Sequence, residues 1–169
     1  MNNYILRYGI GGAIVSIALG LFNWFTVAQW HGVTASQTVG WLSIILSLMC
    51  IPLGIRYFRD KLNKGRVSFG EGFRTGLGIT FVVSVLMYFY SALFFIFQGD
   101  EFIEWTKRGL SPSEIAAYEQ QIAQSPAWVY TPWFQAFLLF VSILLIGVVI
   151  TAISSLILKR AGEPPGDRH

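Results

Sequence analysis

Long apolar blocks separated by short charged segments are the feature that most constrains this chain. Of its 169 residues, 54% are hydrophobic and 12% are charged, which is about half the charged share of a soluble globular domain. The apolar residues stand together in runs of about 20, the length that a helix needs to cross a bilayer. The pattern therefore predicts an all-α integral membrane protein.

Four transmembrane helices are expected within a single domain that covers residues 1–160. Their predicted bounds are about 6–25, 38–58, 69–97 and 133–158. A short uncharged loop, 27–37, joins the first two helices, and Pro52 with Gly54 predicts a kink in the second. The proline-rich tail, 161–169, is expected to be disordered.

Two sequences typical of helix starts divide the rest of the chain. Ser68 to Glu71 and Ser111 to Glu114 both have the spacing of a capping box, and Pro112 suits the first position of the second helix. The second box lies in the long loop 98–132 and opens a short amphipathic helix over about 112–124. This helix is too short and polar to cross a membrane, so we expect it on the outer surface.

The segment 56–74, here called the basic elbow, fixes the predicted orientation. Ten of the twelve Lys and Arg residues lie at the N-terminus, in the elbow or at the C-terminus, and two lie in loop 98–132. Basic residues mark cytoplasmic loops, so both termini are predicted to be cytoplasmic. The elbow serves as a topology signal, and it also offers a contact for anionic lipid or an acidic partner segment through Arg56, Arg59, Lys61, Lys64, Arg66 and Arg74.

The tryptophans all fall at the opposite, outer side of the predicted bundle. Tryptophan favours membrane interfaces, and an ordinary interfacial belt is the simpler interpretation. A ligand-binding aromatic cap is the alternative. Its members would be Trp24, Trp30, Trp41, Trp105, Trp128 and Trp133.

Small residues recur every four positions on three of the predicted helices. Such stripes let helix backbones approach closely. They supply more packing faces than one four-helix bundle must use, which favours a homo-oligomer or a partner membrane protein. The stripes are Gly12, Ser16 and Gly20; Gly72 and Gly76; and Gly147, Thr151 and Ser155.

The two halves of the chain also resemble each other faintly. Residues 7–11 are similar to residues 74–78, and residues 41–46 are similar to residues 140–145. With two crossings in each half, such a repeat would be parallel, around an axis along the membrane normal. Chance similarity between glycine- and serine-rich helices is the other explanation.

Several functions are disfavoured by what the helices lack. No ionisable residue stands near the middle of a predicted span, which disfavours an ion-coupled transporter, a channel or an intramembrane hydrolase. Asn23 is the strongest polar candidate, and an interhelical hydrogen bond would account for it. The lone Cys50 and His31 form no metal-ligand pattern. We therefore expect no cofactor, no metal, no nucleic acid and no catalysis.

The elbow pattern resembles a known family. Tyr57, Arg59-Asp60-Lys61, Asn63, Gly65, Val67-Ser68-Phe69-Gly70 and Gly72-Phe73 are similar to the signature of the family catalogued as domain of unknown function 4199, common in Bacteroidota. Residues 4–9, 113–116 and 154–160 resemble the family too, although Glu71 stands where a lysine is expected. The resemblance implies four helices in a bacterial inner membrane. It supplies no activity and no catalytic residues, and members are often encoded near membrane glycosyltransferases.

Three functions remain open at this point. The first is a non-enzymatic structural or partner-binding membrane module. The second is the handling of a lipid or a lipid-linked glycan as an accessory to a membrane glycosyltransferase, with the aromatic cap and the basic elbow as the two ends of a site. A small transporter or channel is third.

Overall fold

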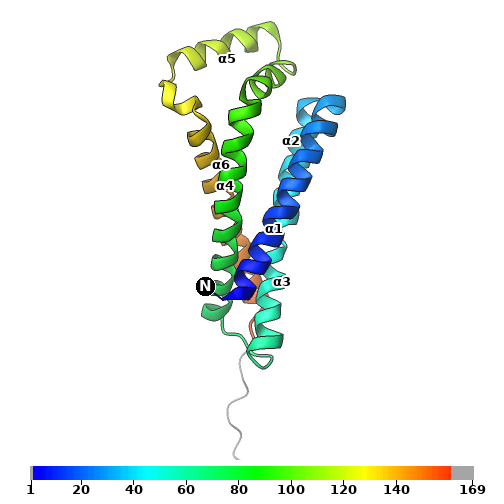
Figure 1. Ribbon diagram of the computed structural model, residues 1–169, viewed down its shortest axis with the longest axis vertical. Helices are drawn as coiled ribbons and strands as arrows, with labels where there is room; N and C mark the ends of the chain where they lie inside the picture. Colours follow the sequence, from blue (N-terminus) through cyan, green and yellow to red (C-terminus); the bar gives the residue numbers. More distant parts are fainter. Residues whose placement is uncertain (1, 161–169) are drawn as a thin grey trace, which may run out of the picture.

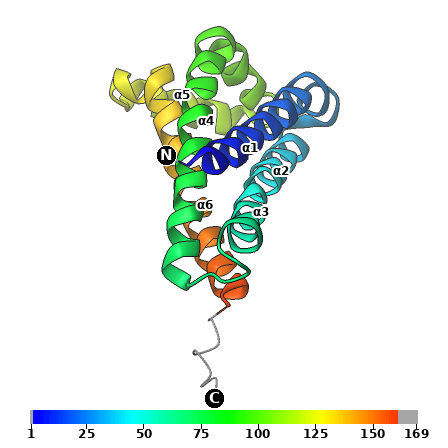
Figure 2. The ribbon, with the colours of Figure 1, turned by 60° about the horizontal axis from the view of Figure 1, so that its bottom comes forward.

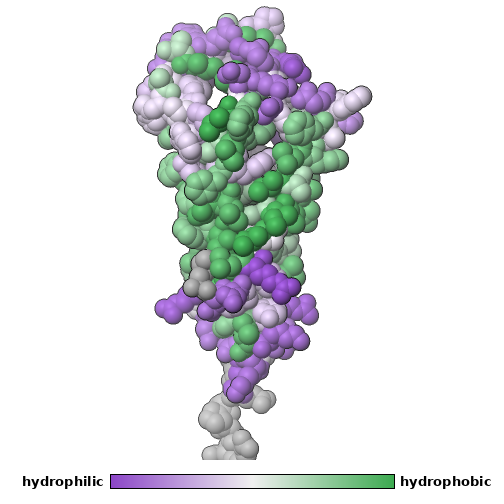
Figure 3. All heavy atoms as spheres, viewed as in Figure 1, coloured by the Kyte–Doolittle hydropathy of each residue, from purple (hydrophilic) through white to green (hydrophobic). Residues whose placement is uncertain are grey.

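A computed structural model describes residues 2–160, and these form an all-helical molecule (Figure 1). Within this part of the chain there is no β-strand, only one isolated bridge between Val67 and Arg160. The predicted disordered tail, 161–169, lies outside the described residues. Three helical segments are long and apolar enough to cross a membrane: Asn3–Leu62, Phe69–Lys107 and Pro132–Leu158. An apolar band lies between two hydrophilic ends of the molecule (Figure 3).

The first segment is a helical hairpin rather than one straight rod. It consists of α1 (Asn3–Phe22), a π-helical turn (Asn23–Val27), α2 (Ala28–Leu48), α3 (Cys50–Tyr57) and a second π-helical turn (Phe58–Leu62). The chain folds back at Gly32, whose φ of 80° is open to glycine without steric cost. The expectation of a loop over 27–37 is wrong, because one glycine makes the turn and helix continues on both sides.

The helix is interrupted near Pro52, where the sequence predicts a kink. The hairpin's second arm is interrupted at Met49, between α2 and α3. Proline has no backbone N–H, so Pro52 cannot donate to the carbonyl of Leu48 one turn earlier. The interruption falls at the turn where this bond is missing.

The long helix α4 (Phe69–Lys107) ends ten residues later than predicted. Its 39 residues span about 58 Å, well beyond a bilayer's hydrocarbon core. The predicted helix stops at Phe97 because polar residues follow. Glutamate and lysine are good helix formers, however, so the helix continues through them. Both predicted capping boxes are present, at Ser68 with Glu71 and at Ser111 with Glu114.

Two further helices complete the fold. The helix α5 (Pro112–Gln124) has the bounds that its capping box predicts, and a 3₁₀ turn (Ala127–Tyr130) leads into α6 (Pro132–Leu158). The helices α1, α4 and α6 and the hairpin's second arm, α2 with α3, pack together toward the end of the molecule where the elbow lies (Figure 2). Their buried core there is Leu48, Ile51, Ile55, Ile79, Val83, Met87 and Ile143.

Small residues let α4 and α6 pack closely along an antiparallel line. Gly72 faces Ser155, Gly76 faces Thr151, and Gly147 faces Thr80. The two residue numbers of each pair sum to 227, so the register is constant over two helical turns. A Cβ atom at Gly76 would stand 2.5 Å from Cγ2 of Thr151, which leaves no room for any larger residue.

The helices α1 and α4 run parallel, and their register bears on the internal repeat. Residues that contact each other across the two helices lie at about the same depth. The residue numbers of such pairs differ by 71 for Tyr4 and Thr75, by 73 for Ile5 and Gly78, and by 74 for Trp24 and Gln98. A repeat around an axis along the membrane normal requires equivalent residues at equal depth. The similar residues 7–11 and 74–78 differ by only 67 in number, so the observed register of α1 against α4 does not place them at equal depth. The repeat stays a prediction.

Exchanging Gly76 for alanine tests the close packing of α4 on α6. We expect Gly76→Ala to lower the free energy of unfolding by about 1–3 kcal/mol, because β-branched Thr151 cannot move aside without leaving its rotamer. The matched control is Gly11→Ala in α1, where no atom lies within 4 Å of the added methyl group. Thermal unfolding in detergent measures both, and equal stability of the two variants would contradict this packing.

Candidate functional site

A cavity of about 380 Å³ lies between the hairpin and the pair α4 and α6. The two halves of the molecule diverge toward the end where α5 lies (Figure 1), and the cavity occupies this divergence. We name it the aromatic cavity. Its walls are Gly20, Asn23, Trp24, Ser36, Tyr90, Ser91, Phe94, Phe95, Phe102, Trp105, Gln135, Leu138, Leu139 and Ser142.

Two buried tryptophans connect the halves beside this cavity. The indole N–H of Trp24 donates to Oε1 of Gln98 at 3.2 Å, and that of Trp105 donates to the carbonyl of Ala28 at 2.9 Å. The two rings stand edge to face with centroids 5.7 Å apart, and Phe102 lies against both. These contacts hold the hairpin to the far end of α4, although the helices themselves diverge there.

Asn23 places a buried acceptor at the cavity wall. Its Nδ2 donates to the carbonyl of Ser36 in α2 at 3.0 Å, which is the interhelical hydrogen bond expected from the sequence. Its Oδ1 is also buried, and no donor within residues 2–160 reaches it. Buried polar atoms almost always have a partner, so this oxygen is an unsatisfied acceptor in a residue that lines the cavity. Asn23 opens a π-helical turn, a local form frequent at functional sites.

A second cavity of about 390 Å³ adjoins the first beneath α5, and we name it the aspartate cavity. The two cavities share Phe95, Phe102 and Gln135. The amide N–H of Gln135 donates to the carbonyl of Val129 at 2.9 Å, which fixes the side chain between them. The other walls of the aspartate cavity are Ile96, Gly99, Asp100, Ile103, Tyr118, Tyr130 and Pro132.

The position of α5 over the aspartate cavity is fixed by one lysine. Lys107 at the end of α4 pairs with Glu104 at 3.0 Å and with Glu119 of α5 at 3.2 Å. Burial, together with the neighbouring Tyr130, raises the pKa of the Tyr118 hydroxyl, so this tyrosine stays neutral at physiological pH.

The predicted aromatic cap separates into two groups in the structure. Trp24 and Trp105 are 5% and 4% exposed and form one cluster. The other four tryptophans are more than half exposed and lie apart from it, as in an ordinary interfacial belt: Trp30, Trp41, Trp128 and Trp133.

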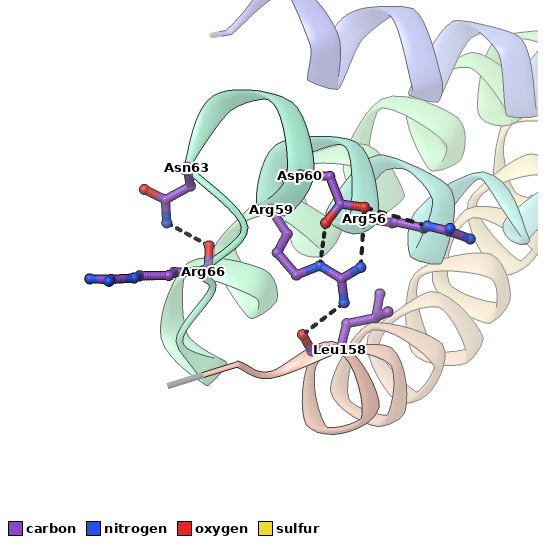
Figure 4. A network of polar contacts seen from close by, with 6 residues as sticks. All are labelled: Arg56, Arg59, Asp60, Asn63, Arg66 and Leu158. Atoms are coloured by element: carbon purple, nitrogen blue, oxygen red, sulfur yellow. Dashed lines mark hydrogen bonds and ion pairs between the residues drawn. The ribbon is translucent and has the colours of Figure 1, made fainter. Parts of the chain in front are cut away.

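The basic elbow contains one buried cation, Arg59 (Figure 4). Its guanidinium donates twice to the carboxylate of Asp60, at 2.6 and 3.1 Å, and once to the carbonyl of Leu158 at 3.5 Å. Arg56 lies 3.5 Å from the same carboxylate. Arg59 therefore joins the elbow to the end of α6, a structural role that its place in the basic run does not reveal.

The end of α6 adds two cations to the elbow. The backbone groups of Val67 and Arg160 exchange two hydrogen bonds of 3.0 and 3.2 Å. This bridge brings Lys159 and Arg160 beside Lys64 and Arg66 around an open cavity of about 740 Å³. Asn63, Ser68 and Glu71 supply its other polar groups. Of the predicted contact residues, Arg56, Arg59, Lys61 and Arg74 do not line it.

The small-residue stripes face other helices of the same chain. Gly12 lies against Cys50 and Ser47, Gly20 against Tyr90, and the glycines of α4 and α6 against each other's helix. Ser16, Thr151 and Ser155 are buried as well. These positions are used inside the bundle, so the stripes no longer supply an argument for an oligomer, and an oligomer or partner protein stays a prediction.

Removing Arg59 tests its role in joining the elbow to α6. We expect Arg59→Met to lower the free energy of unfolding by about 1–3 kcal/mol, because it leaves the Leu158 carbonyl without its donor and Asp60 without its closest partner. Arg66→Met, at an exposed position of the same turn, is the control. Equal stability of the two variants in a detergent unfolding assay would show that Arg59 is only a surface charge.

One family matches the chain. The model of the family described as "Protein of unknown function (DUF4199)" covers residues 7–160, which includes the elbow and both cavities. No curated protein and no solved structure matches the sequence.

Proposed function

Because the chain belongs to the DUF4199 family, whose description assigns no activity, we propose a function from its geometry: a membrane module that binds a lipid-like amphiphile in the aromatic cavity. The observation that carries the proposal is the buried, unpartnered Oδ1 of Asn23 in the wall of an aromatic cavity. A hydrocarbon chain suits the aromatic walls, and a hydroxyl or N–H of the same molecule suits the oxygen.

The proposed setting is a bacterial inner membrane crossed four times. The segment Asn3–Leu62 folds back at Gly32, so its two arms would make two crossings, and α4 and α6 would make one each. With the basic elbow on the cytoplasmic side, both termini are cytoplasmic and α5 lies outside. The apolar band between hydrophilic ends supports this placement (Figure 3).

The size and position of the cavity favour a lipid. Its volume lies within the range of about 300–1,000 Å³ that small-molecule sites occupy. Leu138 on its wall is 46% exposed on α6, so the cavity reaches the side that would face the acyl chains of the bilayer. A lipid tail could enter from there without passing through water.

The lining favours binding over catalysis. Among the described residues that line the aromatic cavity there is no carboxylate, imidazole, amine or thiol. Its serine and tyrosine hydroxyls therefore have no base beside them to activate a nucleophile. Amides, hydroxyls and indoles in this arrangement can hold and orient a ligand, so we propose a non-enzymatic role.

Filling the cavity tests the proposal. We expect the wild-type protein to retain a specific lipid through gentle purification, and Ser142→Phe to lose most of it because the ring occupies the ligand's space. Leu145→Phe is the control, since it adds an aromatic ring to a 62%-exposed position of the same helix outside the cavity. Native mass spectrometry identifies what remains bound.

Two results of that experiment would refute the lipid site. One is a wild-type protein that carries only the bulk lipid mixture. The other is equal lipid retention by Ser142→Phe and Leu145→Phe. The same spectra report whether a second copy or another membrane protein stays bound, which tests the predicted partner separately.

The basic elbow favours a second binding role, contact with anionic lipid headgroups. Lys64, Arg66, Lys159 and Arg160 surround one open cavity, and each cation near an anionic surface contributes about 1 kcal/mol. Replacing all four with glutamine should reduce co-purified anionic lipid several-fold. Lys61→Gln with Arg74→Gln removes elbow charge outside the cavity, and an equal loss there would indicate a general charge effect instead of a site.

A further inference from the structure

We propose that the amphiphile carries an ammonium head group, held by Asp100 and the surrounding aromatic rings in the aspartate cavity while its chain occupies the aromatic cavity. This inference rests on the proposed function and names the chemical class of its ligand. It follows from the adjacency of the two cavities, from the single charge in their walls and from the charge of the surrounding loop.

The two cavities form neighbouring compartments with different character. Phe95, Phe102 and Gln135 belong to both walls, so the two cavities are neighbours that share these side chains. The aromatic cavity contributes indole, phenyl and small polar groups, whereas the aspartate cavity adds a carboxylate under α5. This division matches a ligand with an apolar chain and a charged head.

The sign of that charge follows from Asp100. Among the described residues that line either cavity, Asp100, which is exposed, is the one acidic side chain, and none is a lysine, arginine or histidine. No Lys or Arg within residues 2–160 lies within ion-pair distance of it. A cationic head group would therefore supply a counter-ion that the described protein residues do not.

The aromatic walls favour an ammonium group over other cations. Phe95, Phe102, Tyr118 and Tyr130 line the same cavity as Asp100. Aromatic faces attract ammonium and alkylated ammonium groups, and cages of this composition recognise such ligands in other proteins. A tyrosine is ordinarily neutral at neutral pH, and burial raises the pKa of Tyr118 further, so it adds no second negative charge.

A phosphate or carboxylate head is disfavoured at this end. Residues 98–132 hold five acidic and two basic side chains, a net charge of −3. Lys107, one of the two basic residues, is engaged by Glu104 and Glu119. An anionic group beside Asp100 would meet repulsion, so anionic lipid is expected at the elbow instead.

Matched probes in neutral detergent test the head-group class. Dodecylammonium and dodecanol have the same chain and differ in charge, and calorimetric titration of the full-length protein gives both affinities. We expect dodecylammonium to bind at least about fivefold more tightly than dodecanol. Asp100→Asn should remove this preference, and Glu101→Gln, which lies outside both cavities, should keep it.

The outcomes separate this inference from the proposed function. If dodecanol binds, Ser142→Phe prevents its binding, and the ammonium preference is absent, the lipid site stands and the ammonium head is refuted. An equal effect of Asp100→Asn and Glu101→Gln also refutes it, because the general charge of the loop then explains the preference. If neither probe binds, both proposals fail.

A third probe identifies the source of the ammonium group. Lysophosphatidylethanolamine presents an ammonium beside a phosphate, as a membrane lipid does, whereas dodecylammonium represents a free cationic amphiphile. Tighter binding of the lysolipid, lost in Asp100→Asn, assigns the site to an ammonium lipid. Tighter binding of dodecylammonium, lost in the same variant, assigns it to a cationic amphiphile. Equal affinity of the lysolipid in wild type and Asp100→Asn overturns the role of Asp100 for lipid heads.

Discussion

The size of the side chains along the helices determines the shape of this molecule. At the elbow end, glycines and small hydroxyl residues let the rods approach closely: Gly9 faces Val82, Gly12 faces Cys50, and Gly76 faces Thr151. Toward α5 the contacts are made by tryptophans and phenylalanines, which hold the backbones further apart. The helices therefore converge at one end and diverge at the other, and the aromatic cavity is the result of that divergence.

The divergence is stable because polar contacts join the two halves at the open end. The indole N–H groups of Trp24 and Trp105 each find an acceptor across the gap, and in a low-dielectric environment an unsatisfied donor is costly. Asn23 differs from them in having one buried oxygen left over. The cavity is thus lined by side chains that stabilise the open shape, and Asn23 leaves one buried acceptor unsatisfied among the described residues.

Much of the fold could be predicted from the sequence because it depends on local patterns. Apolar runs predict the long helices, and the capping boxes predict the starts of α4 and α5. Pro52 predicts a disturbance of the helix, which is interrupted nearby at Met49. The two errors concern where helices end. Gly32 alone turns the hairpin where a loop is expected. The helix α4 continues past Phe97 because glutamate and lysine are good helix formers, and Lys107 also pairs with Glu104 and with Glu119 of α5.

Less of the candidate site could be predicted, because residues from the hairpin, α4 and α6 all contribute to it. Asn23, Tyr90, Gln135 and Ser142 come from helices whose mutual register no local pattern specifies. The tryptophan positions did point to the correct end of the molecule, but only Trp24 and Trp105 belong to the cavity. In the elbow, charge counting could not distinguish Arg59, which is buried between Asp60 and the end of α6, from its exposed neighbours.

Photocrosslinking with a lipid whose acyl chain carries a diazirine tests the central claim most directly. After illumination in a bilayer, mass spectrometry maps the labelled residues. The account predicts strong labelling at Trp24, Tyr90, Phe94, Leu139 and Ser142, which line the aromatic cavity. It predicts weaker labelling at Leu145, Val149 and Ile153, which are exposed on α6 outside it. Labelling that follows surface exposure alone, with no excess in the cavity, would contradict the account.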